Sequence, residues 1–330
     1  QAGQTLAINT QSLSNNAGLV RGKTLTVTAK QVDNRNGGTF YGSDTAQLRV
    51  SDTLTNQSGS GIYAQTTLTL EVVGALLNDA ATLAATTINL TAASLGNKAA
   101  AQIVADAGLN IELRGHVLND AATLAAATLT LKGGSLTNQA SAQVVADNAL
   151  RVDVKGSVLN IGATLAAGET LTIESGSLVE NTAGGVVAGE TIRVKARDIR
   201  NRGRARILGS DIELTAQNAF YSETQASIQA SNNLAIDALS FTASASELLA
   251  GNDLSLTLGS YQNSALISSQ NTASLSFKNN ASLLIDAAFK TPQAANLFTL
   301  SAHDITITGE LNAPGSVQIV AAGDVRNQGA

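Results

Sequence analysis

The segment from Ile192 to Ile207, IRVKARDIRNRGRARI, contains the densest concentration of positive charge in the chain. Seven of the 20 basic residues fall within 14 positions: Arg193, Lys195, Arg197, Arg200, Arg202, Arg204 and Arg206. Guanidinium groups bind carboxylates, sulfates and phosphates through paired hydrogen bonds. This basic cluster is therefore a candidate site for a sulfated glycan, a lipopolysaccharide phosphate or an acidic receptor loop.

The alternative for the basic cluster is a solvated face, partly neutralised by Asp198, Asp211 and Glu213, or a device against strand mispairing. If Ile192 and Val194 face inward, one outer strand face is shared by Arg193, Lys195 and Arg197. The arginines from 202 to 206 would then line a neighbouring face.

Aromatic residues gather in the last third of the chain, where they offer a second candidate surface. Phe220, Tyr221 and Tyr261 are candidates for sugar stacking or for protein contact, because exposed rings supply a large contact area at low entropy cost. The alternative is that several of these rings replace leucine in the core of wider coils.

No sequence pattern typical of a catalytic or metal site is recognisable. We find no nucleophile and base pair, no cluster with metal-ligand spacing, no phosphate loop and no dinucleotide fingerprint. The two histidines, His116 and His303, lie far apart in the sequence. We therefore predict no enzymatic activity, no cofactor and no metal. The alternative, a polysaccharide-processing β-helix enzyme, would need convergent carboxylates on one face.

One ten-residue segment recurs in three near-copies that lie 41 residues apart. The copies read LLNDAATLAA from Leu76, VLNDAATLAA from Val117 and VLNIGATLAA from Val158. A second, related triplet lies between them, so the period divides into two units of about 20 residues. Repeats of this length are typical of a solenoid, whose function lies on its long outer faces.

Each unit opens on an alternating apolar pair, such as Leu25/Val27, Leu48/Val50 and Leu68/Leu70. Alternation at period two predicts short half-buried strands, and no helical periodicity is sustained. Strands this short, joined by turn residues, predict an all-β fold in which each unit is one coil of a parallel β-helix. We expect about 16 coils of roughly 20 residues, less regular in the C-terminal third.

Asparagine recurs at one place in successive units. Because asparagine tolerates left-handed backbone and can cap turn amides, we expect a structural ladder of stacked side chains at one corner. The ladder would contain Asn15, Asn34, Asn56, Asn78, Asn97, Asn119, Asn138, Asn160, Asn181 and Asn201.

Composition sets further limits. A net charge of −5 argues against nucleic acid as a partner, and the absence of cysteine fits passage through an oxidising compartment. No signal peptide or membrane-spanning run is recognisable, and repeats already in phase by Leu6 indicate a segment of a longer chain. We divide the chain into regular β-helix repeats, residues 1–215, and a modified continuation, residues 216–330.

The order of apolar pair, apolar-x-Asn, glycine and apolar-x-Ala, as in LTNQSGSGIYA from Leu54, resembles the haemagglutinin repeats of two-partner secretion exoproteins. That family includes filamentous haemagglutinin and the contact-dependent growth inhibition effectors. The resemblance implies a right-handed β-helix in a non-enzymatic shaft or receptor-binding segment, used for adhesion or for toxin delivery to neighbouring cells. It also implies a secreted or cell-surface location in Gram-negative bacteria, an outer-membrane transporter and a surface receptor or glycan as partners, and a monomeric fibre.

Overall fold

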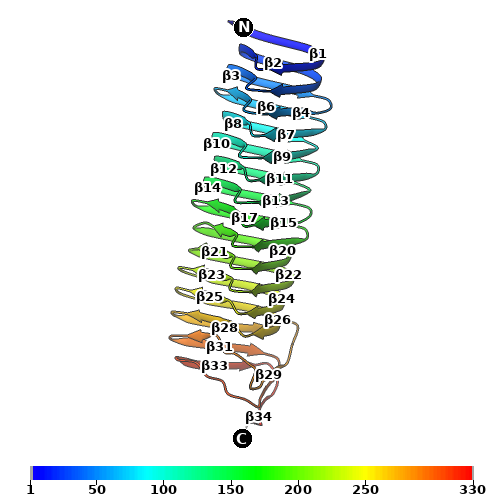
Figure 1. Cartoon of the computed structure of the whole chain (residues 1–330). Coiled ribbons are helices and arrows are strands. Elements are labelled where there is room, and N and C mark those ends of the chain that lie inside the picture. Colours follow the sequence, from blue (N-terminus) through cyan, green and yellow to red (C-terminus); the bar gives the residue numbers. More distant parts are fainter. Residues whose placement is uncertain (1–2, 329–330) are drawn as a thin grey trace. The chain divides into compact units, whose positions relative to one another are not determined.

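The computed structural model describes residues 3–328, which form two compact units, residues 3–171 (unit 1) and 172–328 (unit 2). All regular elements within these residues are strands. A search of the same residues found no helix long and apolar enough to cross a membrane. The two units hold about 15 coils of about 21 residues, so the predicted parallel β-helix is confirmed. Figure 1 shows successive strands stacked within each unit.

Unit 1 is built from strands that pair in parallel with the strands one coil before and one coil after. The strand β17 (Thr170–Ser175) begins in unit 1 and ends in unit 2. The other strands of unit 1 are β1 (Thr5–Asn16), β2 (Leu19–Arg35), β3 (Thr39–Val50), β4 (Leu54–Gln57), β5 (Gly61–Ala64), β6 (Thr67–Val72), β7 (Ala75–Asp79), β8 (Thr82–Ala92), β9 (Ser94–Lys98), β10 (Gln102–Leu113), β11 (His116–Asp120), β12 (Thr123–Gly133), β13 (Ser135–Gln139), β14 (Gln143–Val154), β15 (Val158–Ile161) and β16 (Thr164–Ala167).

Unit 2 repeats the same parallel pairing from one coil to the next. Its strands are β18 (Leu178–Thr182), β19 (Val186–Ala188), β20 (Thr191–Arg202), β21 (Arg206–Gly209), β22 (Asp211–Glu223), β23 (Ser227–Ala230), β24 (Leu234–Ser244), β25 (Glu247–Ala250), β26 (Leu254–Asn263), β27 (Leu266–Ser269), β28 (Thr272–Phe277), β29 (Leu283–Ile285), β30 (Gln293–Ala294), β31 (Leu297–Ala302), β32 (Ile305–Ile307), β33 (Ser316–Ala321) and β34 (Val325–Asn327).

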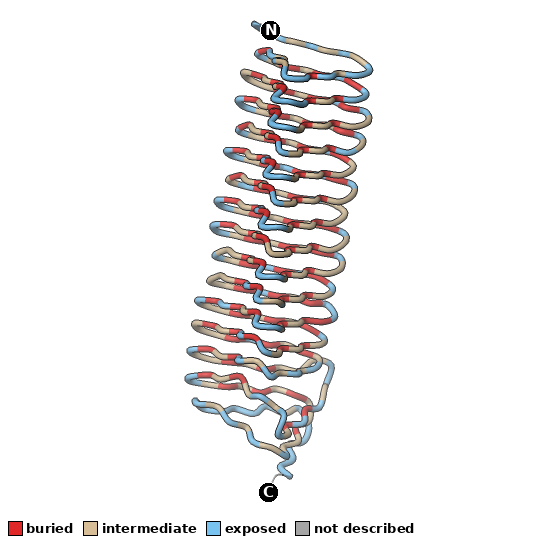
Figure 2. The backbone as a smooth tube through the Cα atoms, viewed as in Figure 1, coloured by how far each residue is buried: buried red, intermediate tan, exposed pale blue. Residues whose placement is uncertain are grey.

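One coil of unit 1 has three strand faces, as in β6, β7 and the first part of β8. Buried and less buried residues alternate along each face, because successive side chains of a strand point to opposite sides. The inward side chains are aliphatic and have almost no exposed surface, as at Leu68, Leu70 and Leu83. Figure 2 shows this alternation of buried and less buried residues along the backbone of the coils, up to the last coil, where the strands β33 and β34 are almost wholly exposed.

Inward side chains form columns that run from coil to coil. One column of unit 1 joins Leu25, Ala46 and Leu68, and the next joins Val27, Leu48 and Leu70. The predicted equivalence of Leu48/Val50 with Leu25/Val27 was therefore wrong by two residues. Alanine fills the first inward position of that coil, and a search for large aliphatic pairs passes over it.

Unit 2 changes after Phe277, within the C-terminal third that the sequence predicts to be less regular. There β28 is followed by the short strand β29 and by a loop that contains Pro292 and returns to β30. β29, β32 and β34 form a separate three-stranded parallel sheet. The boundary at residues 215/216 falls within unit 2, inside β22, and stays a prediction about regularity.

Candidate functional site

The recurring asparagines lie inward at the end of one strand face, and their side chains form a continuous chain of hydrogen bonds in unit 1. Each Nδ2 donates to the Oδ1 of the asparagine one coil ahead, over 2.8–2.9 Å from Asn15 to Asn160. Each Nδ2 also donates to a backbone carbonyl, such as Thr123 O for Asn97. From Asn34 to Asn160 these residues are at most 1% exposed, so the ladder satisfies amides that would otherwise be buried unpaired.

In unit 2 the ladder is short. Asn181 donates to Asn201 Oδ1 over 3.0 Å, and the same column continues as Ser222 and Ala243. The adjacent inward column changes at the same coils, from Ile199 to Phe220 and then to Phe241.

The expected reason for asparagine at this corner was partly wrong. Residues with left-handed backbone follow the ladder positions by two, as at Ala99 (φ 53°) and Ala121 (φ 47°), whereas the ladder asparagines themselves do not have positive φ. Asparagine is required here for its side-chain amide, which donates and accepts along the column. Its tolerance of left-handed backbone is not used.

The basic cluster begins on β20. Ile192 and Val194 are buried, and Arg193, Lys195 and Arg197 are exposed on the outer side of the same strand. The strand bends between Ala196 and Asp198, where its register with β22 shifts, so Arg200 and Arg202 belong to the next face. Gly203 and Arg204 then form a left-handed corner, each with φ 64°, and Arg206 starts β21.

Several members of the basic cluster have partners. Arg202 Nη2 lies 2.5 Å from Oε1 of Glu180, a carboxylate that is only 13% exposed. Arg193 Nε lies 3.5 Å from Glu213 Oε2, and both side chains are more than half exposed. Arg204 Nε donates to Gln225 Oε1 over 2.9 Å. The ammonium of Lys195 and the guanidinium of Arg206 make no polar contact with the described residues.

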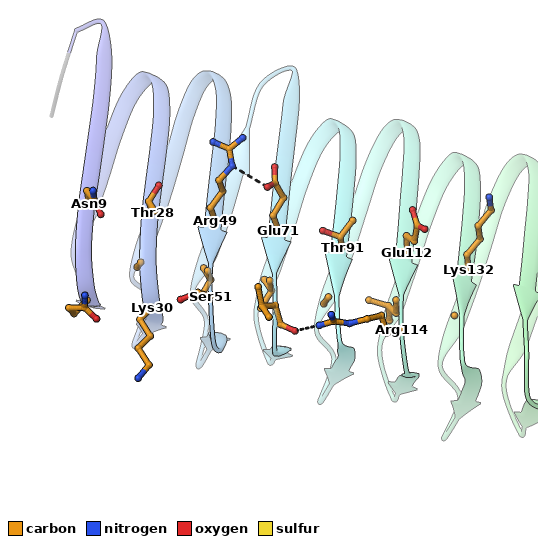
Figure 3. A pocket seen from close by; sticks show the side chains of 18 of the residues that line it. Asn9, Thr28, Lys30, Arg49, Ser51, Glu71, Thr91, Glu112, Arg114 and Lys132 are labelled. Atoms are coloured by element: carbon orange, nitrogen blue, oxygen red, sulfur yellow. Dashed lines mark hydrogen bonds and ion pairs between the residues drawn. The ribbon is translucent and has the colours of Figure 1, made fainter.

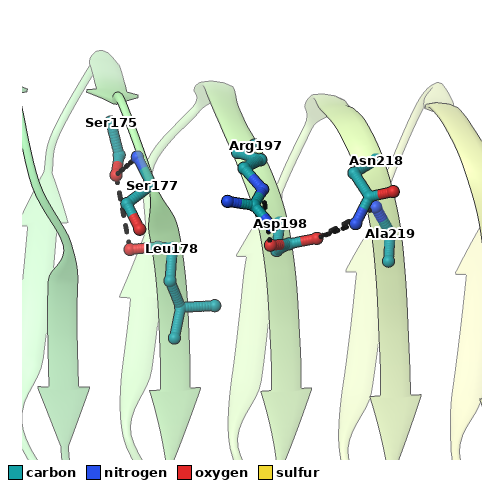
Figure 4. A network of polar contacts seen from close by, with 7 residues as sticks. All are labelled: Ser175, Ser177, Leu178, Arg197, Asp198, Asn218 and Ala219. Atoms are coloured by element: carbon teal, nitrogen blue, oxygen red, sulfur yellow. Dashed lines mark hydrogen bonds and ion pairs between the residues drawn. The ribbon is translucent and has the colours of Figure 1, made fainter.

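Asp198 is the centre of a polar network on this side of unit 2 (Figure 4). One of its oxygens lies 3.5 Å from Arg197 Nε, and the other accepts from Asn218 Nδ2 over 2.8 Å and from the Ala219 amide over 3.2 Å. Asp211, the third acid expected to neutralise the cluster, instead accepts from Asn232 and Asn233. Neutralisation therefore involves Glu180, Asp198 and Glu213.

The aromatic candidates lie in different environments. Phe220 has no exposed surface and stacks on Phe241 at 5.3 Å between ring centroids, so a receptor cannot reach it. Tyr261 continues the stack at 5.5 Å from Phe241, and its hydroxyl donates to Lys290 O over 2.7 Å. Burial raises the pKa of Tyr261. Tyr221 faces outward, and the Arg200 guanidinium carbon lies 5.4 Å from its ring centroid.

Sequence reasoning missed a groove of about 1150 Å³ on unit 1. Its long side is one outward column of side chains in register on successive coils, and a shorter column beyond the bend includes Lys30, Ser51, Arg114 and Lys155. The long column contains Asn9, Thr28, Arg49, Glu71, Thr91, Glu112, Lys132 and Asp153.

Figure 3 shows seven of these residues side by side along the coils. The position that follows each opening apolar pair would have revealed the column, because it recurs once per coil. The groove itself is completed by residues beyond that position, such as Lys30 and Arg114, and the repeat pattern does not indicate that these residues line a shared cavity.

The acids of the groove are spaced. Glu71, Glu112 and Asp153 occupy alternate coils, separated by Thr91 and Lys132 in the same column. Glu71 Oε2 lies 3.1 Å from Arg49 Nε, and Asp153 Oδ2 lies 3.6 Å from Arg151 Nη2. No two of the groove's described carboxylates lie on adjacent coils, which is not the convergent arrangement that glycoside hydrolysis uses.

One pair of residues relevant to nucleophilic chemistry does meet, although it was not recognised in the sequence. His116 Nδ1 lies 2.8 Å from Ser135 Oγ, because the two residues are in register on β11 and β13. Burial lowers the pKa of His116. A third group that would orient the imidazole is absent among residues 3–328, as is any group of three acids, histidines or cysteines placed to hold a metal.

A family model for the haemagglutinin repeat matches residues 1–58, 90–183 and 145–223, which together make up more than half of the chain. Neither the curated proteins nor the solved structures gave a significant match. Haemagglutinin repeats form non-enzymatic, adhesin-like parts of secreted surface exoproteins and are associated with two-partner secretion. The coil length, the apolar columns and the family match agree, and the chain belongs to the haemagglutinin-repeat family.

Proposed function

We propose that this chain is a shaft or receptor-binding segment of a large exoprotein on the surface of a Gram-negative bacterium. In this proposal an outer-membrane transporter of the two-partner secretion type exports the exoprotein, which then serves adhesion or contact-dependent delivery of a toxin to neighbouring cells. Family membership supports secretion and display at the surface. Backbone pairing between neighbouring coils allows folding coil by coil, and no disulfide takes part because the chain contains no cysteine.

One observation carries the proposal. Apolar columns fill the interior of the coils in each unit, and in unit 1 the asparagine ladder continues through eight successive members. A partner can therefore bind only to the outer faces. Repeat proteins of this kind present extended surfaces, which suits a shaft and a receptor-binding segment.

We place the receptor contact on the basic cluster. Lys195 and Arg206 are exposed and make no polar contact with described residues. Arg193 is paired only loosely, at 3.5 Å from Glu213 Oε2, and can exchange that carboxylate for a phosphate or sulfate of a receptor. Arg202 and Arg204 hold neighbouring coils through Glu180 and Gln225, so they position the loop.

A cell-binding experiment tests this function. The chain is labelled and mixed with intact Gram-negative cells, and a triple variant, Arg193→Gln/Lys195→Gln/Arg206→Gln, is compared with the wild type. The control is Arg21→Gln/Lys23→Gln/Lys98→Gln, which removes the same charge from unit 1. We expect the cluster variant to bind about tenfold less tightly and the control to bind as the wild type does.

Equal binding by both variants would remove the basic cluster from the proposal. A wild-type chain that does not bind any cell surface would contradict a receptor-binding role and leave a spacer function.

A further inference from the structure

We propose that the groove of unit 1 binds a linear acidic polysaccharide, which lies along the stack of coils with its carboxylates against Arg114, Lys132 and Lys155. The inference goes beyond the proposed function. It assigns a ligand to residues of unit 1, whereas the basic cluster belongs to unit 2.

The charge of the groove favours an anion. Its lining contains five basic side chains, Lys30, Arg49, Arg114, Lys132 and Lys155, against three acidic ones, Glu71, Glu112 and Asp153. The groove therefore has a formal charge of +2, whereas the whole chain has a charge of −5. A positive cleft on an acidic protein concentrates the field where a polyanion would lie.

The free cations lie close together at one end of the groove. Two acids are engaged by arginines, Glu71 by Arg49 and Asp153 by Arg151. Lys132 and Lys155 are exposed, and their ammonium groups make no polar contact with described residues. Glu112 stays exposed beside them and weakens the positive field without cancelling it.

Arg114 is held in position along the groove before any ligand arrives. Its Nη2 donates to the carbonyl oxygen of Val73, 41 residues earlier in the sequence (Figure 3). This contact uses one donor of the guanidinium and leaves others for a carboxylate. A fixed arginine loses less conformational entropy on binding than a mobile one, so the contact prepares the site.

The spacing of the cations suits a sugar polymer. Arg114, Lys132 and Lys155 lie on three successive coils, and coils are about 4.8 Å apart. This step is close to the length of one extended sugar residue, so a chain along the groove places about one sugar on each coil. Asn9, Thr28, Ser51 and Thr91 offer hydroxyl and amide groups that both donate to and accept from sugar hydroxyls.

The ligand must be charged. None of the described residues that line the groove is aromatic, so a neutral sugar would find no ring to stack on.

An acidic peptide fits less well, because the backbone groups beside the bend are already paired between coils. The amides of Ser51, Val73 and Arg114 donate to the carbonyls of Ala29, Val50 and Ala92. A peptide therefore cannot add as a strand, which is how extended peptides usually bind to sheets.

Binding of a hexamer of galacturonic acid to the full chain, measured by calorimetry at low salt, tests the inference. The variant Arg114→Gln/Lys132→Gln/Lys155→Gln should bind at least about tenfold more weakly, whereas Glu112→Gln should bind about threefold more tightly. Arg21→Gln/Lys23→Gln/Lys98→Gln, with the same charge change outside the groove, should bind as the wild type does. Circular dichroism checks that each variant is folded.

Three further measurements separate the alternatives. Arg114→Lys keeps the charge but shortens the reach toward Val73, and we expect it to bind several-fold more weakly. A neutral glucose hexamer should not bind, and a glutamate hexapeptide should bind more weakly than the acidic sugar. Equal binding of the acidic sugar to the wild type and the groove variant, or tighter binding of the peptide, would overturn the proposal.

In the background of the cluster variant Arg193→Gln/Lys195→Gln/Arg206→Gln, the groove substitutions should weaken binding of the acidic sugar by the same factor as in the wild type. Failure of the groove and failure of the proposed cell contact are therefore distinguishable, because each has its own variant and its own readout.

Discussion

Each ladder asparagine of unit 1 uses one side-chain amide group to bond with the neighbouring asparagines and with a backbone carbonyl. Asn97 accepts from Asn78 through Oδ1, donates to Asn119 through Nδ2 and also donates to the carbonyl of Thr123 at the start of β12. The side chain thus links three coils and also binds the backbone of the coil that follows its own. An isosteric aspartate could accept these bonds but not donate them, which explains the recurrence of the amide.

Replacing one ladder residue should be costly. Asn97→Ala leaves the Oδ1 of Asn119 without its side-chain donor and removes one acceptor from Asn78, in a site with no exposed surface. We expect the free energy of unfolding to fall by about 2–4 kcal/mol. Urea denaturation measures the change, and the control is Asn110→Ala, whose bond to Asn89 lies on the surface. Equal losses in both variants would contradict a special role for the buried amides.

The left-handed corners store strain that a single substitution can relieve. Ala121 is exposed and has φ 47°, a conformation that disfavours a Cβ atom. Ala121→Gly should therefore raise the free energy of unfolding, by up to about 1 kcal/mol after the entropy of glycine is subtracted. The reference is Ala125→Gly within β12, which should destabilise; destabilisation at both sites would refute the strain.

At this scale the sequence predicts which residues stack but not why. The spacing of Asn78, Asn97 and Asn119 identifies one column, because each unit contributes one asparagine. The backbone conformation two residues later is not visible in the sequence, since Ala80, Ala99 and Ala121 are residues that rarely adopt positive φ.

At the scale of the strands, unit 2 replaces stacked asparagines with stacked aromatic rings in the neighbouring inward column, which contains Ile199. Where the asparagine column gives way to Ser222 and Ala243, the neighbouring column becomes Phe220, Phe241 and Tyr261. The rings are nearly parallel, with interplanar angles of 10° and 13°. Larger rings fill the volume that the smaller side chains of the corner leave empty.

The middle ring of this stack should matter most. Phe241→Leu removes both ring contacts while it keeps an apolar side chain, and we expect a loss of about 1–2 kcal/mol in the free energy of unfolding. Phe241→Ala adds a cavity and should cost about 3–5 kcal/mol. Thermal unfolding followed by circular dichroism measures both, and a loss smaller for alanine than for leucine would contradict a packed column.

Because of Tyr261, the free energy of unfolding should fall when the pH becomes alkaline. Burial raises the pKa of its phenol above the ordinary value of 10.0, so the folded chain favours the protonated form. The stabilisation is complete below pH 10.0 and is lost as the pH rises toward the folded pKa. Tyr261→Phe should therefore lose less stability than the wild type between pH 9 and pH 11, measured by urea unfolding; parallel curves would contradict this.

The sequence predicts most of the strands, but it does not predict the register between all neighbouring coils, because alanine occupies some inward positions. Pairs of large aliphatic residues locate most coils, as at Leu68/Leu70 and Leu129/Leu131. Ala46 and Ala273 occupy the first inward position of their coils, and a rule based on large side chains selects the next pair along the strand instead.

For the whole molecule, the surface was harder to foresee than the core. The basic cluster was visible because its residues are consecutive, whereas the groove collects residues about 21 positions apart, from Asn9 to Lys155. A column of this kind has no signature within any single coil, and comparing the position after each opening apolar pair from coil to coil is needed to find it. It becomes apparent only when the register of the coils is known.

Stability along a stack of coils should be graded. β1 pairs with β2 and has no strand on its other edge among the described residues, whereas β10 pairs on both edges with β8 and β12. We expect hydrogen exchange, followed by mass spectrometry, to protect the amides of β10 at least about tenfold more than those of β1. Uniform protection across unit 1 would indicate a single all-or-none core.

The near-copies that lie 41 residues apart occupy every second coil, so Asn78 and Asn119 are equivalent positions two coils apart. Unequal recombination between the DNA segments that encode them would delete or duplicate two whole coils. The product would still align amide with amide and leucine with leucine at the junction. Lineages that carry this chain can therefore differ in length in steps of 41 residues without a compensating mutation.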